Sequence, residues 1–259
     1  MSLKRHLLQR IADAIYAVSR ILAPGVYARD GLISVHDHDF MRDPVFLKAY
    51  DRGIQAIGGK DAYQWQWRIH IGLWAAHTAS KVPGDFVECG VNRGFQSSAI
   101  MQMLDWDSTC RHFYLLDTFA GIDPQHLSEE EIRRGALQKN EDSLRSEFYV
   151  SGVEGVRANF SQWRNQTIIQ GSVPDTLDQI KSERIAYLHL DMNCAPPEVA
   201  ALRFCWERMP AGAVVLMDDY AYFGCQPQKD ALDEFAAEKG VAICALPTGQ
   251  GLLIRPPGA

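Results

Sequence analysis

Residues 84–94 read Gly-Asp-Phe-Val-Glu-Cys-Gly-Val-Asn-Arg-Gly, and this stretch decides the fold class of the chain. Its apolar run, 85–89, has the length of a buried strand, and the turn after it carries Gly90 and Gly94. Glycine lets the backbone of such a turn approach a ligand closely. A helix that begins near Phe95 would offer free N–H groups and the positive end of its dipole, which suit a carboxylate or a phosphate. The stretch therefore predicts a strand, a ligand-binding glycine loop and a helix.

Downstream of this stretch, short apolar runs alternate with amphipathic stretches, a pattern typical of βαβ units around a buried parallel sheet. We expect an α/β, Rossmann-like fold with a mostly parallel seven-stranded sheet and helices on both faces. The expected strands are Asp85–Cys89, His112–Asp117, Thr167–Gln170, Ala186–Asp191, Ala213–Asp218, Val241–Ala245 and Leu252–Arg255. The expected helices between them are Gln96–Leu104, Pro174–Ile180, Pro197–Arg208 and Lys229–Lys239.

The chain divides into a helical N-terminal extension, residues 1–82, and an α/β domain, residues 83–259. Within the extension, Tyr63–Ala79 has helical periodicity, and an apolar stripe within residues 1–22 has it too. We expect that stripe to be a helix packed on the domain. A membrane-surface helix and a dimer contact are the alternatives.

One connection, residues 119–166, is far longer than an ordinary link between a strand and a helix, and it is rich in Glu and Arg. Long inserts at the carboxyl end of a sheet often act as lids, so a lid-like helical insert after the second strand is expected. The alternative is a solvated helical insert with no role in function.

The composition argues against several classes of protein. The 259 residues carry a formal net charge of −6 with no local cluster of Lys and Arg, so nucleic acid is not an expected partner. Six cysteines are scattered without a Cys-x-x-Cys pair, which indicates a reducing, cytoplasmic compartment. No stretch approaches the roughly 18 consecutive apolar residues of a membrane-spanning helix, so no membrane span is expected.

The glycine loop favours one class of cofactor over another. A dinucleotide-binding loop needs Gly-x-Gly-x-x-Gly, whereas this loop supplies only Gly90 and Gly94, which argues against a nicotinamide cofactor. Asp117 ends the second expected strand, where a carboxylate can accept hydrogen bonds from ribose hydroxyls or cap a turn. Ser172 follows the third strand and could line an adenine or cap the next helix.

Three carboxylates follow the fourth and fifth expected strands: Asp191, Asp218 and Asp219. Because the carboxyl ends of parallel strands share one edge of a sheet, we expect these side chains to converge. Unpaired carboxylates would repel one another, so a hard divalent cation, Mg²⁺ first, is expected to neutralise them, with Asn193 as a further oxygen ligand. The alternative to a metal site is that one of the three aspartates caps a helix and the other two face water. His189 is expected to be a hydrogen-bonded interior histidine.

From about Trp65 to the C-terminus, the order of these motifs resembles the macrocin O-methyltransferase (TylF) family of class I, metal-dependent methyltransferases. The resemblance rests on four segments, 84–91, 116–121, 189–191 and 218–220, which read Gly-Asp-Phe-Val-Glu-Cys-Gly-Val, Leu-Asp-Thr-Phe-Ala-Gly, His-Leu-Asp and Asp-Asp-Tyr. It implies a sheet with an antiparallel final strand, S-adenosylmethionine as methyl donor, and a sugar or natural-product hydroxyl as acceptor. It also suggests self-association, for which the apolar N-terminal stripe would be a contact.

The resemblance also gives roles to individual residues. The cofactor would be held by Glu88, Gly90, Asn92, Gly94, Asp117, Thr118 and Ser172. Mg²⁺ near the acceptor hydroxyl would be held by Asp191, Asp218 and Asp219, and Asp191 would also accept the proton of that hydroxyl. The family commonly has Asp-x-Asp where this chain reads Asp-Met-Asn over residues 191–193. A cofactor-binding protein with a regulatory or partner-binding role and no methyl transfer is therefore the alternative function.

Overall fold

The computed structural model describes residues 14, 18 and 26–259. Except at those first two positions, the helix expected over residues 1–22 lies outside the described residues. Within the described part of the chain, no helix is long and apolar enough to cross a membrane.

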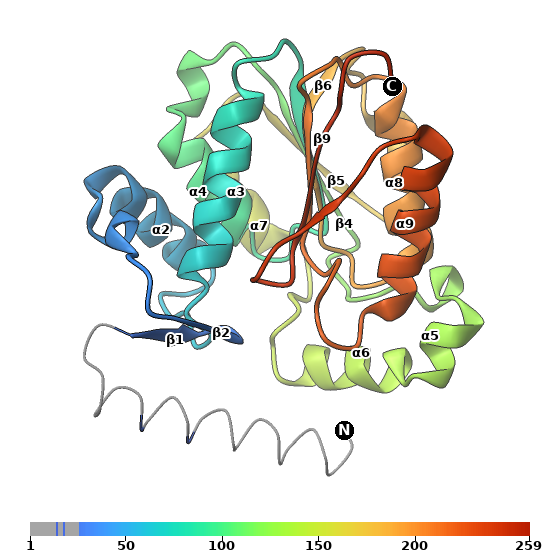
Figure 1. Cartoon of the computed structure of the whole chain (residues 1–259), viewed down its shortest axis with the longest axis horizontal. Helices are drawn as coiled ribbons and strands as arrows, with labels where there is room; N and C mark the ends of the chain where they lie inside the picture. The colour runs from blue at the N-terminus through green and yellow to red at the C-terminus, as the bar shows by residue number, and fades with distance from the viewer. Residues whose placement is uncertain (1–13, 15–17, 19–25) are drawn as a thin grey trace.

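A seven-stranded sheet forms the centre of the fold, in the order β5-β4-β3-β6-β7-β9-β8 (Figure 1). Its strands are β3 (Asp85–Cys89), β4 (Phe113–Asp117), β5 (Gln166–Gln170), β6 (Ile185–Leu190), β7 (Val214–Met217), β8 (Cys244–Ala245) and β9 (Gly251–Ile254). The five neighbouring strands β5, β4, β3, β6 and β7 pair in parallel. Strand β9 is antiparallel to both β7 and β8. Every residue of β6 and β7 is buried, as expected of apolar strands that are covered on both faces. The expected mostly parallel sheet with an antiparallel last strand is confirmed.

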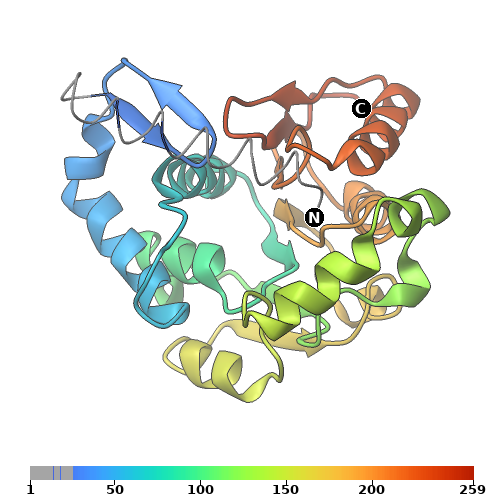
Figure 2. The same cartoon turned by 90° about the horizontal axis from the view of Figure 1, so that it is seen from below.

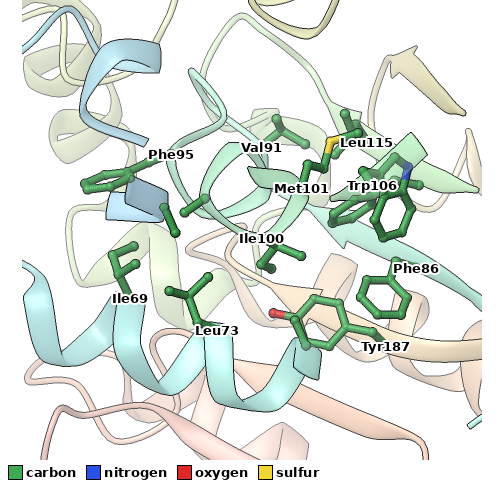
Figure 3. Packing of buried hydrophobic residues seen from close by; sticks show 14 of the residues in the cluster. Ile69, Leu73, Phe86, Val91, Phe95, Ile100, Met101, Trp106, Leu115 and Tyr187 are labelled. Atoms are coloured by element: carbon green, nitrogen blue, oxygen red, sulfur yellow. The ribbon is translucent and has the colours of Figure 1, made fainter. Parts of the chain in front are cut away.

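Helices cover both faces of this sheet. One face carries α2 (Pro44–Ala56), α3 (Gln66–Ala79), α4 (Phe95–Met103) and α7 (Glu154–Phe160), and the other carries α8 (Ala195–Trp206) and α9 (Gln226–Lys239). Each face of the sheet packs against its helices in a separate apolar core. Successive strand residues point to opposite faces, so Phe86 lies in the first core, beneath α2, α3, α4 and α7, and Val87 lies in the second, beneath α8 and α9. Figure 3 shows the first core, in which Leu73 and Ile100 lie beside Tyr187 of the sheet. Both predicted layers of helices are therefore present.

The N-terminal extension contains a hairpin as well as helices, which corrects the expectation of a wholly helical extension. Strands β1 (Tyr27–Arg29) and β2 (Leu32–Ser34) pair antiparallel across Asp30 and Gly31. Both turn residues have positive φ angles, 47° and 72°. Asp-Gly is a strong signal for a two-residue hairpin turn, and the strands are too short to show periodicity in the sequence.

Two expected elements are shorter than the sequence pattern predicted. Over residues 174–180 only a 3₁₀ turn forms, because the N–H of Leu177 donates to Pro174 and that of Ile180 to Leu177, each three residues back. Strand β8 starts late because the N–H of Val241 donates to the carbonyl of Ala236 and completes the end of α9. The 3₁₀ helices are η1 (Asp39–Arg42), η2 (Trp106–Ser108), η3 (Pro124–His126) and η4 (Leu177–Gln179).

The insert over residues 119–166 lies at the carboxyl ends of the central strands, with α5 (Glu129–Arg133) and α6 (Ala136–Arg145) along that edge (Figures 1 and 2). Lys139 Nζ of α6 donates a hydrogen bond to Asn193 Oδ1 at 2.8 Å. Glu131 Oε1 of α5 accepts one from the backbone N–H of Ala195 at 2.6 Å. The insert thus covers the edge of the sheet where the sequence predicts a site.

At the end of β3 the backbone of Gly90 passes close to the carbonyl group of Asp191, which follows β6. The φ angle of Gly90 is 96°, in the left-handed region that favours glycine. A Cβ atom at this position would overlap the Asp191 carbonyl oxygen. Only glycine therefore allows the loop after β3 and the end of β6 to lie together.

Replacing Gly90 by Ala should lower the free energy of unfolding by about 2–4 kcal/mol, because the left-handed backbone and the overlap both cost energy. Gly135→Ala is a matched control, since its φ is 87° and nothing lies within 4 Å of an added Cβ. It should cost only about 1–2 kcal/mol. Urea unfolding measures both changes, and equal losses would contradict the close contact at Gly90.

Candidate functional site

The glycine loop after β3 is fastened to the insert by Asn92. Its side-chain Nδ2 donates to the carbonyl of Phe148 at 2.9 Å, and its Oδ1 accepts from the N–H of Val150 at 2.8 Å. Asn92 has a φ of 49°, and Gly94, with a φ of 85°, caps α4. The side chain of Asn92 thus holds the insert, while the loop and the first turn of α4 present backbone groups.

Asp117 holds the same loop from β4. Its Oδ2 accepts from the N–H of Asn92 at 2.7 Å, and its Oδ1 accepts from the N–H of Phe119 at 2.6 Å. Burial raises its pKa, although these bonds and one from Thr118 oppose the rise. The sequence left open a turn cap and a ribose ligand for Asp117, and the structure shows the cap. The ribose contact stays a prediction.

Ser172 does not cap a helix. Its hydroxyl donates to Asp123 Oδ2 at 2.5 Å, which lowers the pKa of that carboxyl group and ties the end of β5 to the start of the insert. The hydroxyl of Thr118 is likewise used within the loop, where it donates to the carbonyl of Gly121. Both residues shape the rim of the loop in this structure.

Glu88 and His189 form a buried pair beneath the loop. His189 Nδ1 lies 2.9 Å from Glu88 Oε1, and both side chains are 3% exposed. Burial alone would lower the pKa of His189, but Asp218 and Glu88 outweigh it and raise the pKa to about 10. The prediction of an interior histidine with a hydrogen bond is confirmed at Nδ1, whereas Nε2 is buried without a hydrogen-bond partner among the described residues. Within the described residues, Glu88 Oε2 is buried without a hydrogen-bond partner.

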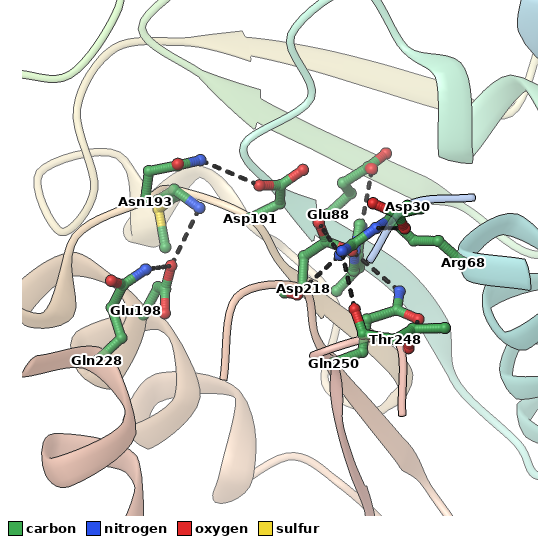
Figure 4. Close-up of polar contacts among 12 residues, drawn as sticks. Asp30, Arg68, Glu88, Asp191, Asn193, Glu198, Asp218, Gln228, Thr248 and Gln250 are labelled. Atoms are coloured by element: carbon green, nitrogen blue, oxygen red, sulfur yellow. Dashed lines mark hydrogen bonds and ion pairs between the residues drawn. The ribbon is translucent and has the colours of Figure 1, made fainter. Parts of the chain in front are cut away.

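Asp218 is engaged by a buried arginine that the sequence analysis did not single out (Figure 4). Arg68 Nη1, from α3, lies 2.7 Å from Asp218 Oδ2, and Gln250 Nε2 donates to Asp218 Oδ1 at 2.9 Å. His189 Nε2 lies 3.8 Å from the same Oδ1. Burial raises the pKa of Asp218, but Arg68 and His189 outweigh it and bring the pKa below its usual range. No sequence pattern indicates a role for Arg68, because it lies within a helix and the residues on either side of it are apolar.

The pKa values of Asp191 and Asp219 are shifted in the opposite direction to that of Asp218. Burial, followed by the charge of Asp218, raises the pKa of each, that of Asp191 to well above its usual range. Asp191 Oδ1 accepts from Asn193 Nδ2 at 3.2 Å. Among the described residues, Asp219 Oδ2 is buried without a hydrogen-bond partner. These two acids therefore ionise less readily than Asp218.

Tyr149 of the insert is a further site residue that sequence reasoning missed. Its hydroxyl is buried and has no hydrogen-bond partner in the described part of the chain. Burial, and then the charges of Asp191 and Asp219, raises its pKa well above the usual value. The hydroxyl therefore lies near enough to the acidic cluster for its pKa to respond to these charges. Tyr149 lies between α6 and α7, where no periodic pattern in the sequence indicates that a side chain belongs to the site.

The predicted convergence of three carboxylates is present, whereas the predicted Mg²⁺ site is not confirmed. Both oxygens of Asp218 already contact nitrogen donors, and one of these donors is the guanidinium cation of Arg68, which would repel a metal ion bound to the same carboxylate. Across residues 14, 18 and 26–259, no group of three or more His, Cys, Asp or Glu side chains could hold a metal ion. The residues at this edge do not fit a divalent cation as they are arranged.

The family model for macrocin O-methyltransferases (TylF) matches residues 73–244 of this chain. The chain belongs to this family. It is 29% identical over 173 residues to 8-demethyl-8-(2,3-dimethoxy-alpha-L-rhamnosyl)-tetracenomycin-C 4'-O-methyltransferase of Streptomyces olivaceus, and 29% over 169 residues to demethyldecarbamoylnovobiocin O-methyltransferase of Streptomyces niveus. Each match covers 63% of this chain and 62% of the relative.

Two solved methyltransferase structures share the fold. The O-methyltransferase NovP superposes with a TM-score of 0.65 at 21% identity, covering 84% of this chain and 97% of NovP. The calicheamicin methyltransferase CalS11 gives a TM-score of 0.59 at 17% identity, covering 87% of this chain and 95% of CalS11. The Rossmann-like methyltransferase fold expected from the resemblance is thereby confirmed.

Glu198, in the first turn of α8, lies behind the acidic cluster. It is 1% exposed, and its Oε1 accepts from the N–H of Met192 at 3.2 Å and from Gln228 Nε2 at 3.4 Å. Burial, and then the charge of Asp219, raises its pKa to about 8. At neutral pH the folded protein therefore keeps Glu198 protonated.

Glu198 should make stability fall as the pH rises. Its pKa in the unfolded chain is about 4.5, so between that pH and about pH 8 only the unfolded chain releases the proton. Glu198→Gln mimics the protonated acid, so its advantage over the wild type should grow by at least about 1 kcal/mol from pH 5 to pH 8. Urea midpoints at several pH values measure this, and a constant difference would show that Glu198 titrates normally.

Proposed function

We propose that this protein is an S-adenosylmethionine-dependent methyltransferase that methylates a hydroxyl group of a sugar or other natural-product small molecule. Membership of the family supports this proposal, and the relatives that match it are named as O-methyltransferases. The observation that carries it is the shared edge of the sheet, where the glycine loop, Asp117 and the acid Asp191 meet beneath the insert. The alternative of a regulatory protein without methyl transfer has no support among those relatives.

The proposed cofactor site is the loop between β3 and α4 with the residues around it: Glu88, Gly90, Asn92, Gly94, Asp117, Thr118 and Ser172. The first turn of α4 has unsatisfied N–H groups that suit the cofactor's carboxylate. The buried, unpartnered Glu88 Oε2 suits its ammonium group. Asp117 keeps lone pairs for ribose hydroxyls beside the N–H groups it already accepts. When bound, S-adenosylmethionine supplies an electrophilic methyl group.

In this proposal Asp191 is the general base for the acceptor hydroxyl. Its raised pKa makes it a stronger proton acceptor than an ordinary carboxylate, and Asn193 fixes the orientation of the group through Oδ1. Asp191 would take the proton of the acceptor hydroxyl, while S-adenosylmethionine would supply the methyl group to that oxygen and leave as S-adenosylhomocysteine. Positioning of the two reactants contributes much of the rate. The hydroxyl of Tyr149 is placed to hydrogen-bond the acceptor.

We also propose that residues 83–259 form the methyltransferase domain and that the insert over 119–166 acts as its lid. Lys139, Glu131 and Asn92 join the insert to the carboxyl edge by hydrogen bonds. Glu88 and Asp219 beneath it are buried, so we expect the insert to move aside when ligands enter. Mg²⁺ has no step in this mechanism, because the donor set does not fit it.

The proposal predicts that Asp191→Asn lowers turnover at least about 100-fold, the usual contribution of a general base. The affinity for S-adenosylhomocysteine should change much less, since Asp191 binds the acceptor side. Formation of S-adenosylhomocysteine from S-adenosylmethionine, measured with a panel of glycosides and phenols, gives the turnover. Asp178→Asn, at an exposed position, is the matched control and should leave turnover unchanged. Full turnover in Asp191→Asn would exclude Asp191 as the base.

A further inference from the structure

Arg68 is held in place by three parts of the chain that are far apart in sequence. Its Nε lies 3.2 Å from Asp30 Oδ2 in the β1–β2 turn. Its Nη1 lies 2.7 Å from Asp218 Oδ2 and donates to the Asp218 carbonyl at 2.9 Å, and its Nη2 donates to the Thr248 carbonyl at 3.0 Å. Arg68 is only 7% exposed, so the guanidinium is a fixed cation and not a mobile surface charge.

The position of this cation matters because of the acids around it. Asp218 lies between Arg68 and His189. The buried guanidinium of Arg68 therefore contacts the carboxylate that the family resemblance assigned to a metal ion. A divalent cation bound to Asp218 would lie within a few ångströms of this guanidinium, and like charges at that distance in a buried site repel strongly.

Charge neutralisation is the requirement that the three acids impose, and it can be met by a metal ion or by protein cations. The side chain of Asp218 is 14% exposed and has both oxygens occupied, so the second solution is already built here. At the rim, Lys139 adds a second positive charge, which opposes the rise in the pKa of Asp219. Among the described residues, Asp219 Oδ2 is buried without a hydrogen-bond partner, and so is the hydroxyl of Tyr149, on which the charges of Asp191 and Asp219 act.

We propose that Arg68 supplies the positive charge that a divalent cation would supply at this edge, so that the site works without a metal ion. This inference rests on the proposed methyltransferase function. Arg68 is a positioning residue in it: the guanidinium fixes Asp218 as a carboxylate and leaves Asp191 free to accept the acceptor's proton. The N-terminal extension, which supplies Arg68 and its partner Asp30, is thereby part of the active site.

Titration of the full-length protein with Mn²⁺, followed by the electron paramagnetic resonance signal of free Mn²⁺, tests the inference without an activity assay. The wild type should not bind Mn²⁺ at this edge at millimolar concentration. Arg68→Gln removes the buried charge and should gain one Mn²⁺ site, together with a thermal midpoint that Mn²⁺ raises. Arg68→Lys keeps the positive charge and should gain neither.

Several outcomes would overturn the inference. One is that the wild type binds one Mn²⁺ ion and that Asp191→Asn lowers the affinity at least tenfold. Another is that Arg68→Lys and Arg68→Gln respond to Mn²⁺ in the same way. The wild-type titration decides the matter even if Arg68→Gln fails to fold.

The rate of methyl transfer gives a second readout. The wild-type rate should change less than twofold when EDTA replaces Mg²⁺, whereas Mg²⁺ should restore part of the rate lost in Arg68→Gln. A wild-type rate that EDTA abolishes and Mg²⁺ restores would contradict the inference. Failure to bind S-adenosylhomocysteine would contradict the proposed function instead, and would leave the result of the Mn²⁺ titration standing.

Discussion

The close approach of Gly90 to the backbone of Asp191 is the constraint on which the site depends. It joins the end of β3 to the end of β6, and the N–H of Asp191 donates to the carbonyl of Cys89 at 2.9 Å beside it. The N–H of Gly90 donates in turn to the carbonyl of Leu116 in β4 at 2.8 Å. Three strand ends are thus fixed to one another within a few residues. The glycine loop and the acid Asp191 are neighbours for that reason, although a hundred residues separate them in sequence.

The charges that gather at this edge are balanced by the protein itself. Asp218 is stabilised in its ionised form by Arg68, while Asp191 and Asp219, which lack such a partner, have raised pKa values. Neighbouring carboxylates in one site commonly divide in this way, since one takes the favourable contacts and the others respond to its charge. The division gives the cluster one anchoring acid and two that can accept a proton.

Much of the fold was predictable from the sequence because buried parallel strands are short apolar runs. Strand β3 has the predicted bounds, Asp85–Cys89, and the other strands of the sheet lie within a residue or a few of the predicted ones. The hairpin at Asp30 was missed because its strands have three residues each, too few for alternation to show. The prediction of an α-helix over 174–180 was wrong because the backbone hydrogen bonds from Pro174 onward join residues three apart, as in a 3₁₀ turn.

The candidate site was predictable only in part. Strand ends are visible in a sequence, so the convergence of Asp191, Asp218 and Asp219 could be inferred. Partners that arrive from distant elements are not visible: Arg68 comes from α3 and Tyr149 from the insert. The expectation of Mg²⁺, which stays unconfirmed, treated all three acids as unpaired, whereas Asp218 is paired with Arg68.

The central claim is that the loop between β3 and α4 binds the product of methyl transfer beneath the insert. Isothermal titration calorimetry of the full-length protein with S-adenosylhomocysteine tests this most directly, with nicotinamide adenine dinucleotide as the comparison ligand. We predict one site per chain with a Kd in the micromolar range for S-adenosylhomocysteine and no heat of binding for the dinucleotide. Absence of binding of S-adenosylhomocysteine, or tighter binding of the dinucleotide, would contradict the account.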